Sequence, residues 1–366
     1  MKIVEIFESV PDFRNSKFVS YKLSEVLVIS LCAVISGADD CEEIAEYAVE
    51  KAEFLGQFLE LPNGTPSHDT FNRIFRNMDI KSFERCLINR SKEILSALDH
   101  HQINVDGKVL RATGERGKKT AAICIVSAWV SEECLCLGQS KVSKKSNEKT
   151  AIPEIIEAVD IKGGLVSIDA MGCDKKIASL IRENEGDYLL ALKKNQKGLY
   201  EEVHDWLLNH KASLDCYEYT DYVGGRIEQR KCYVSNDLSY IDEALQWRDS
   251  KSIIMVESER TFKGGKKETT FQRRFYISSM SQDAVFFERS VRKHWSIENQ
   301  LHWYLDVVFN EDRQRVREGN GAENMALLRK MALQTLLKNK GRKSLKTIRK
   351  KVAWNEKLLI HVLKDF

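Results

Sequence analysis

The residues best suited to chemistry lie in Val291–Arg313, where acidic and histidine side chains recur at every fourth position. These side chains are His294, Glu298, His302 and Asp306. Because residues four apart on a helix lie on neighbouring turns, a helical conformation predicts one polar stripe along this stretch. An apolar flank predicts that the helix packs against a core, and it consists of Trp295, Ile297, Leu301, Tyr304 and Leu305. The stripe is typical of a functional site, but Glu298 taken alone could simply pair with His294 or His302 one turn away.

Two aspartates elsewhere in the chain each follow an apolar, strand-like run. Asp106 lies in INVDGK and Asp169 lies in LVSIDAMG. Taken singly, Asp106 with Gly107 suits a turn, and Asp169 suits the cap of a helix that begins near Cys173. Together with Glu298 they supply three carboxylates from separate elements, and such oxygens are the ligands that hard divalent cations prefer. The three acidic residues therefore predict a metal site.

The same helix also allows a second interpretation, a zinc-dependent hydrolase. The pattern H-x-x-x-E-x-x-x-H places His294, Glu298 and His302 on successive turns, and zinc accepts these ligand types. However, residues spaced by four drift about 40° per step in a helix of 3.6 residues per turn, so the three side chains diverge around the axis. Tight stoichiometric zinc would favour the hydrolase, whereas weak Mg²⁺ or Mn²⁺ binding would favour the three carboxylates.

A family resemblance rests on an ordered set of sequence words. These are SYKLSEVLVISLCAVISGADDCEEI, GTPSHDTFNRIF, VDGK, SNEKTAIPEI, SIDAMGCDKKIA, GDYLLALKKNQ and HWSIENQLHWYLDVVFNED. In that order, over nearly the whole chain, they resemble an insertion-sequence DDE transposase of the H-repeat-associated subgroup. The resemblance implies a catalytic triad of Asp106, Asp169 and Glu298. It also implies that these residues hold Mg²⁺ or Mn²⁺, as two ions, for DNA strand cleavage and strand transfer.

The resemblance further implies the partners of the chain. Double-stranded DNA, as element ends and as target, is the expected partner, and a homodimer on DNA is the expected assembly. One departure concerns second-strand cleavage: hairpin-forming relatives carry Y-x-x-R-x-x-x-E-x-x-x-x-x-x-K, and this chain has Val291, His294 and Leu305 at the Tyr, Arg and Lys positions. The route of that cleavage therefore stays open. A decayed or domesticated DNA-binding protein without activity is a further alternative, although the carboxylates are intact.

Several residues are candidates for DNA contacts. They are Arg73, Arg76, Lys144, Lys145, Lys193, Lys194, Lys197, His302 and Arg313. The lysines at 193–197 follow a predicted strand that ends at Leu192, and the arginines at 73 and 76 lie on the exposed face of a predicted helix. Solvated surface side chains on ordinary elements are the alternative. The same two interpretations hold for the basic segment Lys338–Phe366.

The elements that must position these residues follow from periodicity. Helical spacing of apolar residues predicts an all-helical stretch up to about residue 98. Short runs rich in Val, Ile and Cys then predict strands at 101–110, 121–130, 134–142, 164–170 and 187–192, with helices at 151–159 and 175–183. This order fits an α/β (α+β) fold, a mixed sheet of the ribonuclease-H-like kind that the resemblance implies. Alternating runs between 212 and 279 predict a β-rich insertion.

We expect five segments along the chain. They are an N-terminal helical, DNA-binding domain (1–98), the first part of the catalytic domain (99–211), the β-rich insertion (212–284), the second part of the catalytic domain with the glutamate helix (285–332) and a basic C-terminal helical segment (333–366). The insertion explains why many more residues separate Asp169 from Glu298 than separate Asp106 from Asp169.

Composition sets broad limits on the class of protein. The chain has 366 residues, 43% hydrophobic and 30% charged, with only 4 prolines, which is typical of ordered globular proteins. Its 9 cysteines lack any C-x-x-C pair, which favours reduced thiols and a cytoplasmic protein. The DNA partner that the resemblance implies makes a nucleoid-associated location the expectation. The longest apolar run, Val26–Ala38, is too short to cross a membrane. The net charge of +3 alone does not predict nucleic-acid binding.

Overall fold

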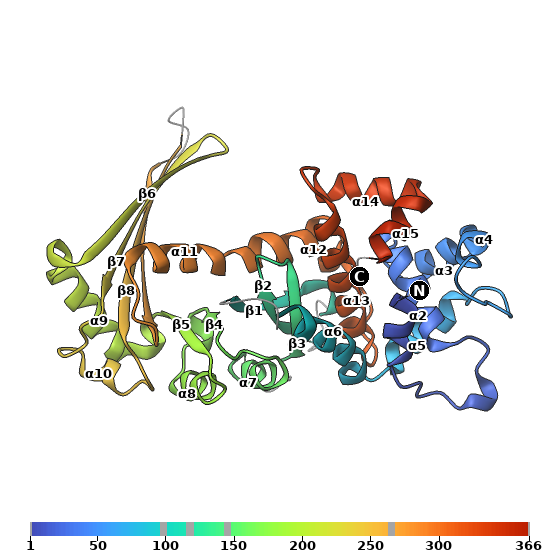
Figure 1. Cartoon of the computed structure of the whole chain (residues 1–366), viewed down its shortest axis with the longest axis horizontal. Helices are drawn as coiled ribbons and strands as arrows, with labels where there is room; N and C mark the ends of the chain where they lie inside the picture. Colours follow the sequence, from blue (N-terminus) through green and yellow to red (C-terminus); the bar gives the residue numbers. More distant parts are fainter. Residues whose placement is uncertain (1, 96–100, 115–120, 143–147, 263–267, 365–366) are drawn as a thin grey trace. The chain divides into compact units, whose positions relative to one another are not determined.

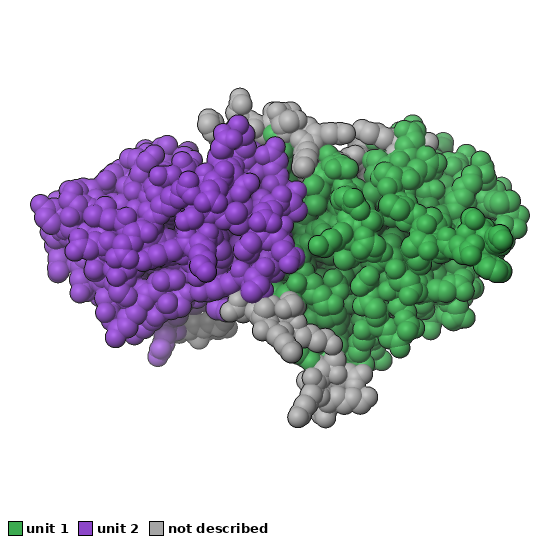
Figure 2. Space-filling view, turned by 90° about the horizontal axis from the view of Figure 1, so that it is seen from below, with its two compact units in different colours: residues 1–97, 107–145, 298–366 green, residues 98–106, 146–297 purple. Residues whose placement is uncertain are grey.

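The structure is a computed structural model that describes residues 2–95, 101–114, 121–142, 148–262 and 268–364. The chain forms two compact units (Figure 2). Unit 1 comprises residues 1–97, 107–145 and 298–366, and unit 2 comprises residues 98–106 and 146–297. The chain therefore passes from one unit to the other more than once. Asp106 is the last residue of its segment in unit 2, and Glu298 is the first residue of its segment in unit 1.

Unit 1 is mainly helical, as the sequence predicts for its N-terminal part. Its N-terminal helices are α1 (Lys2–Glu8), α2 (Leu23–Ser36), α3 (Cys41–Glu50), α4 (Ala52–Leu55), α5 (His68–Asn77) and α6 (Ile80–Leu95). Its C-terminal helices are α12 (Trp303–Val307), α13 (Gly321–Asn339), α14 (Leu345–Trp354) and α15 (Glu356–Lys364). The apolar helix α2 is buried except at Ser36, and it packs against α13, which is buried from Gly321 to Leu337. These two helices form the core of the unit.

The strands form one mixed sheet in the order β3-β2-β1-β4-β5-β9-β8-β7-β6. The strands are β1 (Gln102–Leu110), β2 (Ile123–Val130), β3 (Leu135–Lys141), β4 (Leu165–Ile168), β5 (Asp187–Leu192), β6 (Asp215–Val223), β7 (Arg226–Ser235), β8 (Ser252–Phe262) and β9 (Thr270–Ser278). In unit 1, β2 and β3 form an antiparallel pair. In unit 2, β1, β4 and β5 are parallel neighbours. The α/β fold class and the element order expected for the ribonuclease-H-like part are confirmed.

Helices cover both faces of the parallel strands in unit 2. Helices α7 (Glu148–Ala158) and α8 (Lys175–Glu183) lie on one face, and α11 (Ala284–His294) lies on the other (Figure 1). The core under α11 contains Leu165, Leu189, Ile254, Phe287 and Val291. Helix α7 begins before the predicted residue 151, so Pro153 lies inside the helix and not in its first turn.

The β-rich part extends the same sheet. Strand β9 pairs antiparallel with β5, and β6 to β9 continue outward as antiparallel neighbours. Two helices accompany these strands, α9 (Lys197–Asn209) and α10 (Asp242–Leu245). The sequence interpretation missed α9, although Leu199, Val203 and Leu207 recur at helical spacing and are buried. In the described residues, no helix is long and apolar enough to cross a membrane.

Candidate active site

The two aspartates follow paired residues on adjacent parallel strands of unit 2. The register pairs Asn104 with Ser167 and Val105 with Ile168, so Asp106 and Asp169 are the next residue on each strand. Parallel strands end at the same edge of a sheet, which is where ligands bind in open α/β sheets. Strand β1 continues to Leu110, so Asp106 is not at a strand end as predicted. It lies instead where the pairing with β4 stops.

Asp169 caps the short turn that follows it, whereas the predicted cap on the next helix is wrong, because Asp174 caps α8. The Asp169 Oδ1 accepts a hydrogen bond from the Met171 backbone N–H at 2.9 Å, at the start of the 3₁₀ turn Ala170–Gly172. The cap fixes the direction of the carboxylate and uses only one of its two oxygens. A role as cap is therefore compatible with a role as metal ligand.

The predicted lysine loop lies beside this turn. Asn195 Nδ2 donates to Ala170 O at 2.7 Å, and Gln196 Nε2 donates to Cys173 O at 2.9 Å. These bonds join the loop after β5 to the loop after β4, with Lys193, Lys194 and Lys197 exposed on it. The sequence interpretation missed Asn195 and Gln196, because the backbone carbonyls that they contact are distant in sequence.

The predicted glutamate helix is interrupted at the glutamate itself. Helix α11 ends at His294, residues Ile297–His302 form a π-helical segment, and α12 begins at Trp303. Glu298 is exposed in this π-segment, whereas His302 is buried. A π-turn has an i→i+5 pattern, so residues four apart no longer lie above one another. The continuous stripe predicted from 294 to 306 therefore does not form.

Polar side chains of the parallel strands contact α11 within unit 2. Gln102 Nε2 donates to Ser290 O at 2.8 Å, and Asn104 Nδ2 lies 3.5 Å from Ser296 Oγ. On β4, Ser167 Oγ lies 3.0 Å from His294 Nδ1. Burial lowers the pKa of His294 to about 4, against the opposing effects of Asp169 and Ser167. The ring is therefore neutral at pH 7 and serves as a hydrogen-bonding partner of the sheet.

A second set of contacts, within unit 1, joins β1 to α12. Lys108 Nζ lies 2.5 Å from Asp306 Oδ1, 3.1 Å from Glu311 Oε2 and 3.5 Å from Asp312 Oδ1. Only 9% of the Lys108 side chain and 1% of the Glu311 side chain is exposed. Burial acts to lower the pKa of Lys108, but Glu311 and Asp306 outweigh it and the pKa is raised. Lys108 is therefore a charged, buried link between a strand and a helix.

His302 lies close to the same buried cations. Burial, with smaller effects from Lys330 and Lys108, lowers the pKa of His302 to about 3. Lys330 is itself buried, and its Nζ donates to Ser127 Oγ at 2.9 Å and Gln139 Oε1 at 2.5 Å. A contact between His302 and DNA would require the ring to leave this position, because only 8% of the residue is exposed.

Among the residues that the structure describes, no three His, Cys, Asp or Glu side chains are grouped so that they could hold a metal ion. His294, Glu298 and His302, the three zinc ligands of the hydrolase interpretation, are therefore not grouped in this way. The two aspartates belong to unit 2 and Glu298 to unit 1. The chemistry of the aspartates nevertheless suits a divalent cation, since both offer hard carboxylate oxygens from neighbouring strands.

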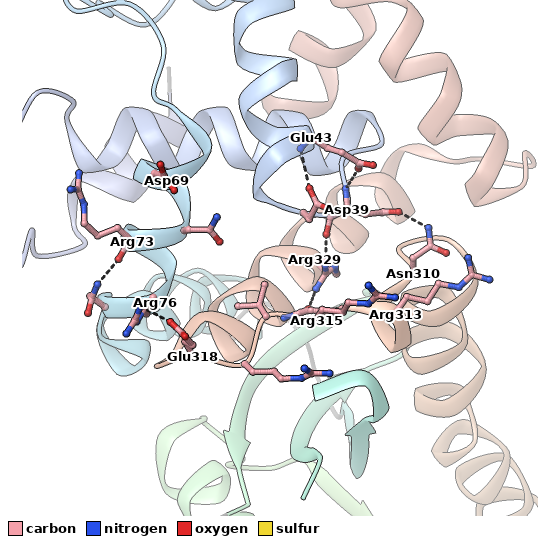
Figure 3. Close-up of a pocket in the computed structure, with 16 residues that line it drawn as sticks. Asp39, Glu43, Asp69, Arg73, Arg76, Asn310, Arg313, Arg315, Glu318 and Arg329 are labelled. Carbon is pink, nitrogen blue, oxygen red and sulfur yellow. Dashed lines mark hydrogen bonds and ion pairs between the residues drawn. The ribbon is translucent and has the colours of Figure 1, made fainter. Parts of the chain in front are cut away.

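Three of the predicted DNA-contacting arginines line one pocket of unit 1, of about 1090 Å³ (Figure 3). Arg73 and Arg76 come from α5, and Arg313 comes from the segment that follows α12. The pocket also contains Arg315, Arg317 and Arg329, which the sequence interpretation did not select. Helix α5 is held there by Asn320, whose N–H donates to Arg76 O at 2.9 Å.

The charges of this pocket are not all neutralised within it. Its acidic side chains have internal partners: Asp40 caps α3, Glu43 accepts from the Asp39 N–H at 2.6 Å, and Asp39 Oδ2 accepts from Asn310. Arg76 pairs with Glu318. Within the described part of the chain, the side chains of Arg73, Arg313 and Arg315 make no ion pair, and all three are exposed. They are available to an anionic ligand.

Two other predicted basic sites have different outcomes. Lys144 and Lys145 lie outside the described residues. In the basic C-terminal segment, Lys346, Lys350 and Lys351 are exposed on α14, but Arg349 is buried. Its guanidinium donates to the carbonyls of Val34, Ala38 and Val308. Arg349 is therefore a structural residue and not part of a phosphate-binding surface.

Comparisons with known proteins identify relatives over the full length. A family model described as "Transposase DDE domain" matches residues 97–334, and one described as "DDE_Tnp_1-associated" matches residues 4–89. The chain is 39% identical to YncI of Escherichia coli O157:H7, which is named as a transposase, over 99% of the chain and 94% of YncI. It is 37% identical to YhhI of E. coli strain K12, which is named as an H repeat-associated transposase, over 99% of the chain and 97% of YhhI.

A solved structure is also similar. A cryo-EM structure of the piggyBac transposase synaptic complex with hairpin DNA matches with a TM-score of 0.42 and 10% identity, over 100% of this chain and 79% of that one. This similarity is too low to support an argument about the site. The relation of the chain to its relatives rests on the sequence matches.

Proposed function

The chain belongs to the DDE transposase family, in its H repeat-associated subgroup, and from this premise we propose that it cleaves and joins DNA strands with Asp106, Asp169 and Glu298. The register of β1 and β4 supports this most directly. Val105 pairs with Ile168, and each aspartate is the next residue along its chain segment. The substrate is double-stranded DNA, first as the ends of an insertion sequence and then as the target.

The proposed chemistry requires little from the protein beyond positioned carboxylates. When bound, a pair of Mg²⁺ or Mn²⁺ ions activates the attacking oxygen and stabilises the leaving oxygen of an in-line displacement at phosphorus. Asp106, Asp169 and Glu298 would hold these ions through their carboxylate oxygens. Asp169 suits this role because its cap leaves Oδ2 outside the turn. The exposed position of Glu298 suits a group that must reach a substrate.

The order of contacts along β1 supports the inclusion of Glu298. Gln102 and Asn104, before Asp106, contact residues that precede Glu298; Lys108, after Asp106, contacts Asp306, which follows Glu298. Side chains at alternate positions of a strand share one face, so Asp106 lies on the face that makes these contacts. In chain order, Asp106 therefore lies between these contacts on β1, and Glu298 lies between their partners.

Two basic regions are proposed to bind the DNA backbone. Lys193, Lys194 and Lys197 are exposed beside the Asp169 turn, where they would hold phosphates next to the reacting strand. In unit 1, Arg73 and Arg313 would contact phosphates away from the chemistry. Phosphate contacts of this kind position DNA without reading its sequence.

The test is strand nicking by three single variants, Asp106→Asn, Asp169→Asn and Glu298→Gln. Each keeps the shape of its side chain but removes the charge that attracts a divalent ion, so each should abolish nicking. Asn at 169 can still accept the Met171 hydrogen bond, so the fold should persist. The measurement uses DNA carrying the ends of the element, with Mg²⁺ and with Mn²⁺, and circular dichroism checks folding.

The controls separate this proposal from its alternatives. DNA binding should persist in all three variants, because lysine and arginine make the phosphate contacts. Full nicking by folded Asp106→Asn would end the proposed mechanism. A wild-type protein that binds element ends but never nicks them would indicate a DNA-binding protein without activity.

A further inference from the structure

We propose that Lys108 is a positioning residue, which links the strand that carries Asp106 to α12, the helix that follows the π-segment of Glu298. This inference rests on the proposed function. It concerns a residue that does not contact the substrate and acts through the carboxylates on either side of it.

Polar residues of β1 share one face of the strand. Gln102, Asn104, Asp106 and Lys108 occupy alternate positions, so their side chains point to one side of the sheet. On this face the strand contacts α11 through Gln102, contacts Ser296, just after α11, through Asn104, and contacts α12 through Lys108. Lys108 is therefore the last of a row of polar side chains that includes Asp106.

Burial of the Lys108 charge removes it from water and costs free energy. Carboxylates offset the cost of burying a charged lysine, and Lys108 has three of them within 3.5 Å. Helix α13 carries a second buried lysine, Lys330, whose Nζ donates to Ser127 Oγ and Gln139 Oε1. A hydrophobic residue could fill the Lys108 position with less desolvation, so the charge indicates a need for a directed contact.

The carboxylate partners of Lys108 come shortly after the π-segment in the chain. Asp306 lies in α12, which directly follows the π-segment, and Glu311 and Asp312 lie in the next turn. Other buried cations hold the same segment from outside: Arg349 donates to Val308 O, and Arg329 to Gln314 Oε1. The wide π-segment would otherwise be free to rewind, because its hydrogen-bond pattern is less favourable than that of an α-helix. Lys108 fixes its C-terminal end relative to β1.

The test compares Lys108→Met with a matched control, Lys141→Met. Lys141 forms an equally short ion pair with Glu323, at 2.5 Å, in the same unit but between β3 and α13. Both variants should lower the melting temperature. Only Lys108→Met should lower the single-turnover nicking rate at saturating DNA and Mn²⁺, by about 100-fold, which is typical of a misplaced reacting group. Lys108→Arg should restore part of the rate.

A second readout does not depend on activity. Hydrogen exchange of backbone amides in peptides covering residues 297–307 should accelerate in Lys108→Met and in Asp306→Asn, and should be unchanged in Lys141→Met. Equal exchange in Lys108→Met and wild type would overturn the proposal, and so would an equal loss of nicking in the Lys141 control. If the wild type does not nick DNA, the proposed function fails, but the exchange experiment still decides the role of Lys108.

Discussion

At the scale of single residues, the protein keeps several ionisable side chains away from water and gives each a specific partner. Lys108 has three carboxylates, Lys330 has a hydroxyl and an amide oxygen, and Arg349 has backbone carbonyls. The sequence could not reveal these roles, because a lysine or arginine in a helix or strand is usually exposed. Asp106, Asp169 and Glu298 stay predicted site residues, and they were selected because a set of sequence words surrounds them.

A prediction at this scale concerns His302. Its ring stays neutral in the folded protein down to a pKa of about 3, whereas the unfolded ring protonates below about pH 6.5. Below pH 6.5 the unfolded state therefore binds more protons, and the free energy of unfolding should fall by about 1.4 kcal/mol per pH unit from this residue.

His302→Gln should remove this part of the slope. The measurement is urea unfolding between pH 7 and pH 4, comparing slopes and not absolute stabilities. His68→Gln, which removes an exposed ring, is the control for the loss of a histidine side chain. Parallel slopes for wild type and His302→Gln would show that the ring is not held neutral.

At the scale of elements, hydrophobic periodicity predicted most helices and strands. The runs at 101–110, 121–130, 134–142 and 187–192 became β1, β2, β3 and β5 with small shifts at the ends. Two features were not predicted from the sequence because they depend on tertiary contacts. The π-segment keeps helical periodicity in sequence, and only its packing widens the turn. Arg349 shares its helix with exposed lysines that have the same sequence signature.

A prediction for the arginine pocket follows from its unpaired charges. The double variant Arg73→Gln, Arg313→Gln should weaken binding to all DNA sequences alike, and it should reduce the slope of log affinity against log salt by about 2 if each arginine contacts one phosphate. The measurement is fluorescence anisotropy over a range of salt concentrations. Arg349→Gln should instead lower stability without changing this slope, since its charge is buried. An unchanged slope in the double variant would assign DNA binding to another surface.

At the scale of the whole molecule, the chain divides into two interleaved units, which the sequence segments did not predict. Composition and periodicity describe neighbours in sequence, whereas units 1 and 2 each combine segments that are distant in the chain. The expected five segments follow changes in secondary structure and remain a prediction about domains. Pairing of β9 with β5 shows why they are difficult to separate: the β-rich part continues the same sheet.

A prediction at this scale concerns the effect of Mn²⁺ on the stability of the folded protein. If Asp106, Asp169 and Glu298 bind divalent ions together, Mn²⁺ should stabilise the folded protein by about 1.4 kcal/mol at ten times its dissociation constant. The measurement is the melting temperature in Mn²⁺ minus that in EDTA. Each of the variants Asp106→Asn, Asp169→Asn and Glu298→Gln should reduce this difference, whereas Lys141→Met should not. The same difference in all variants would place the Mn²⁺ elsewhere.

The pairing of α2 with α13 has a consequence for synthesis of the protein. Helix α2 ends at Ser36, and the helix that covers it begins only at Gly321. At about 5–20 residues per second, a ribosome needs roughly 15 to 60 s to make the intervening chain. During that time the face of α2 that packs against α13 lacks this partner, although α1 and α3 are already made, and it is open to chaperones or to self-association. The yield of this protein in a cell should therefore depend on how its first helices are sheltered while the rest of the chain is translated.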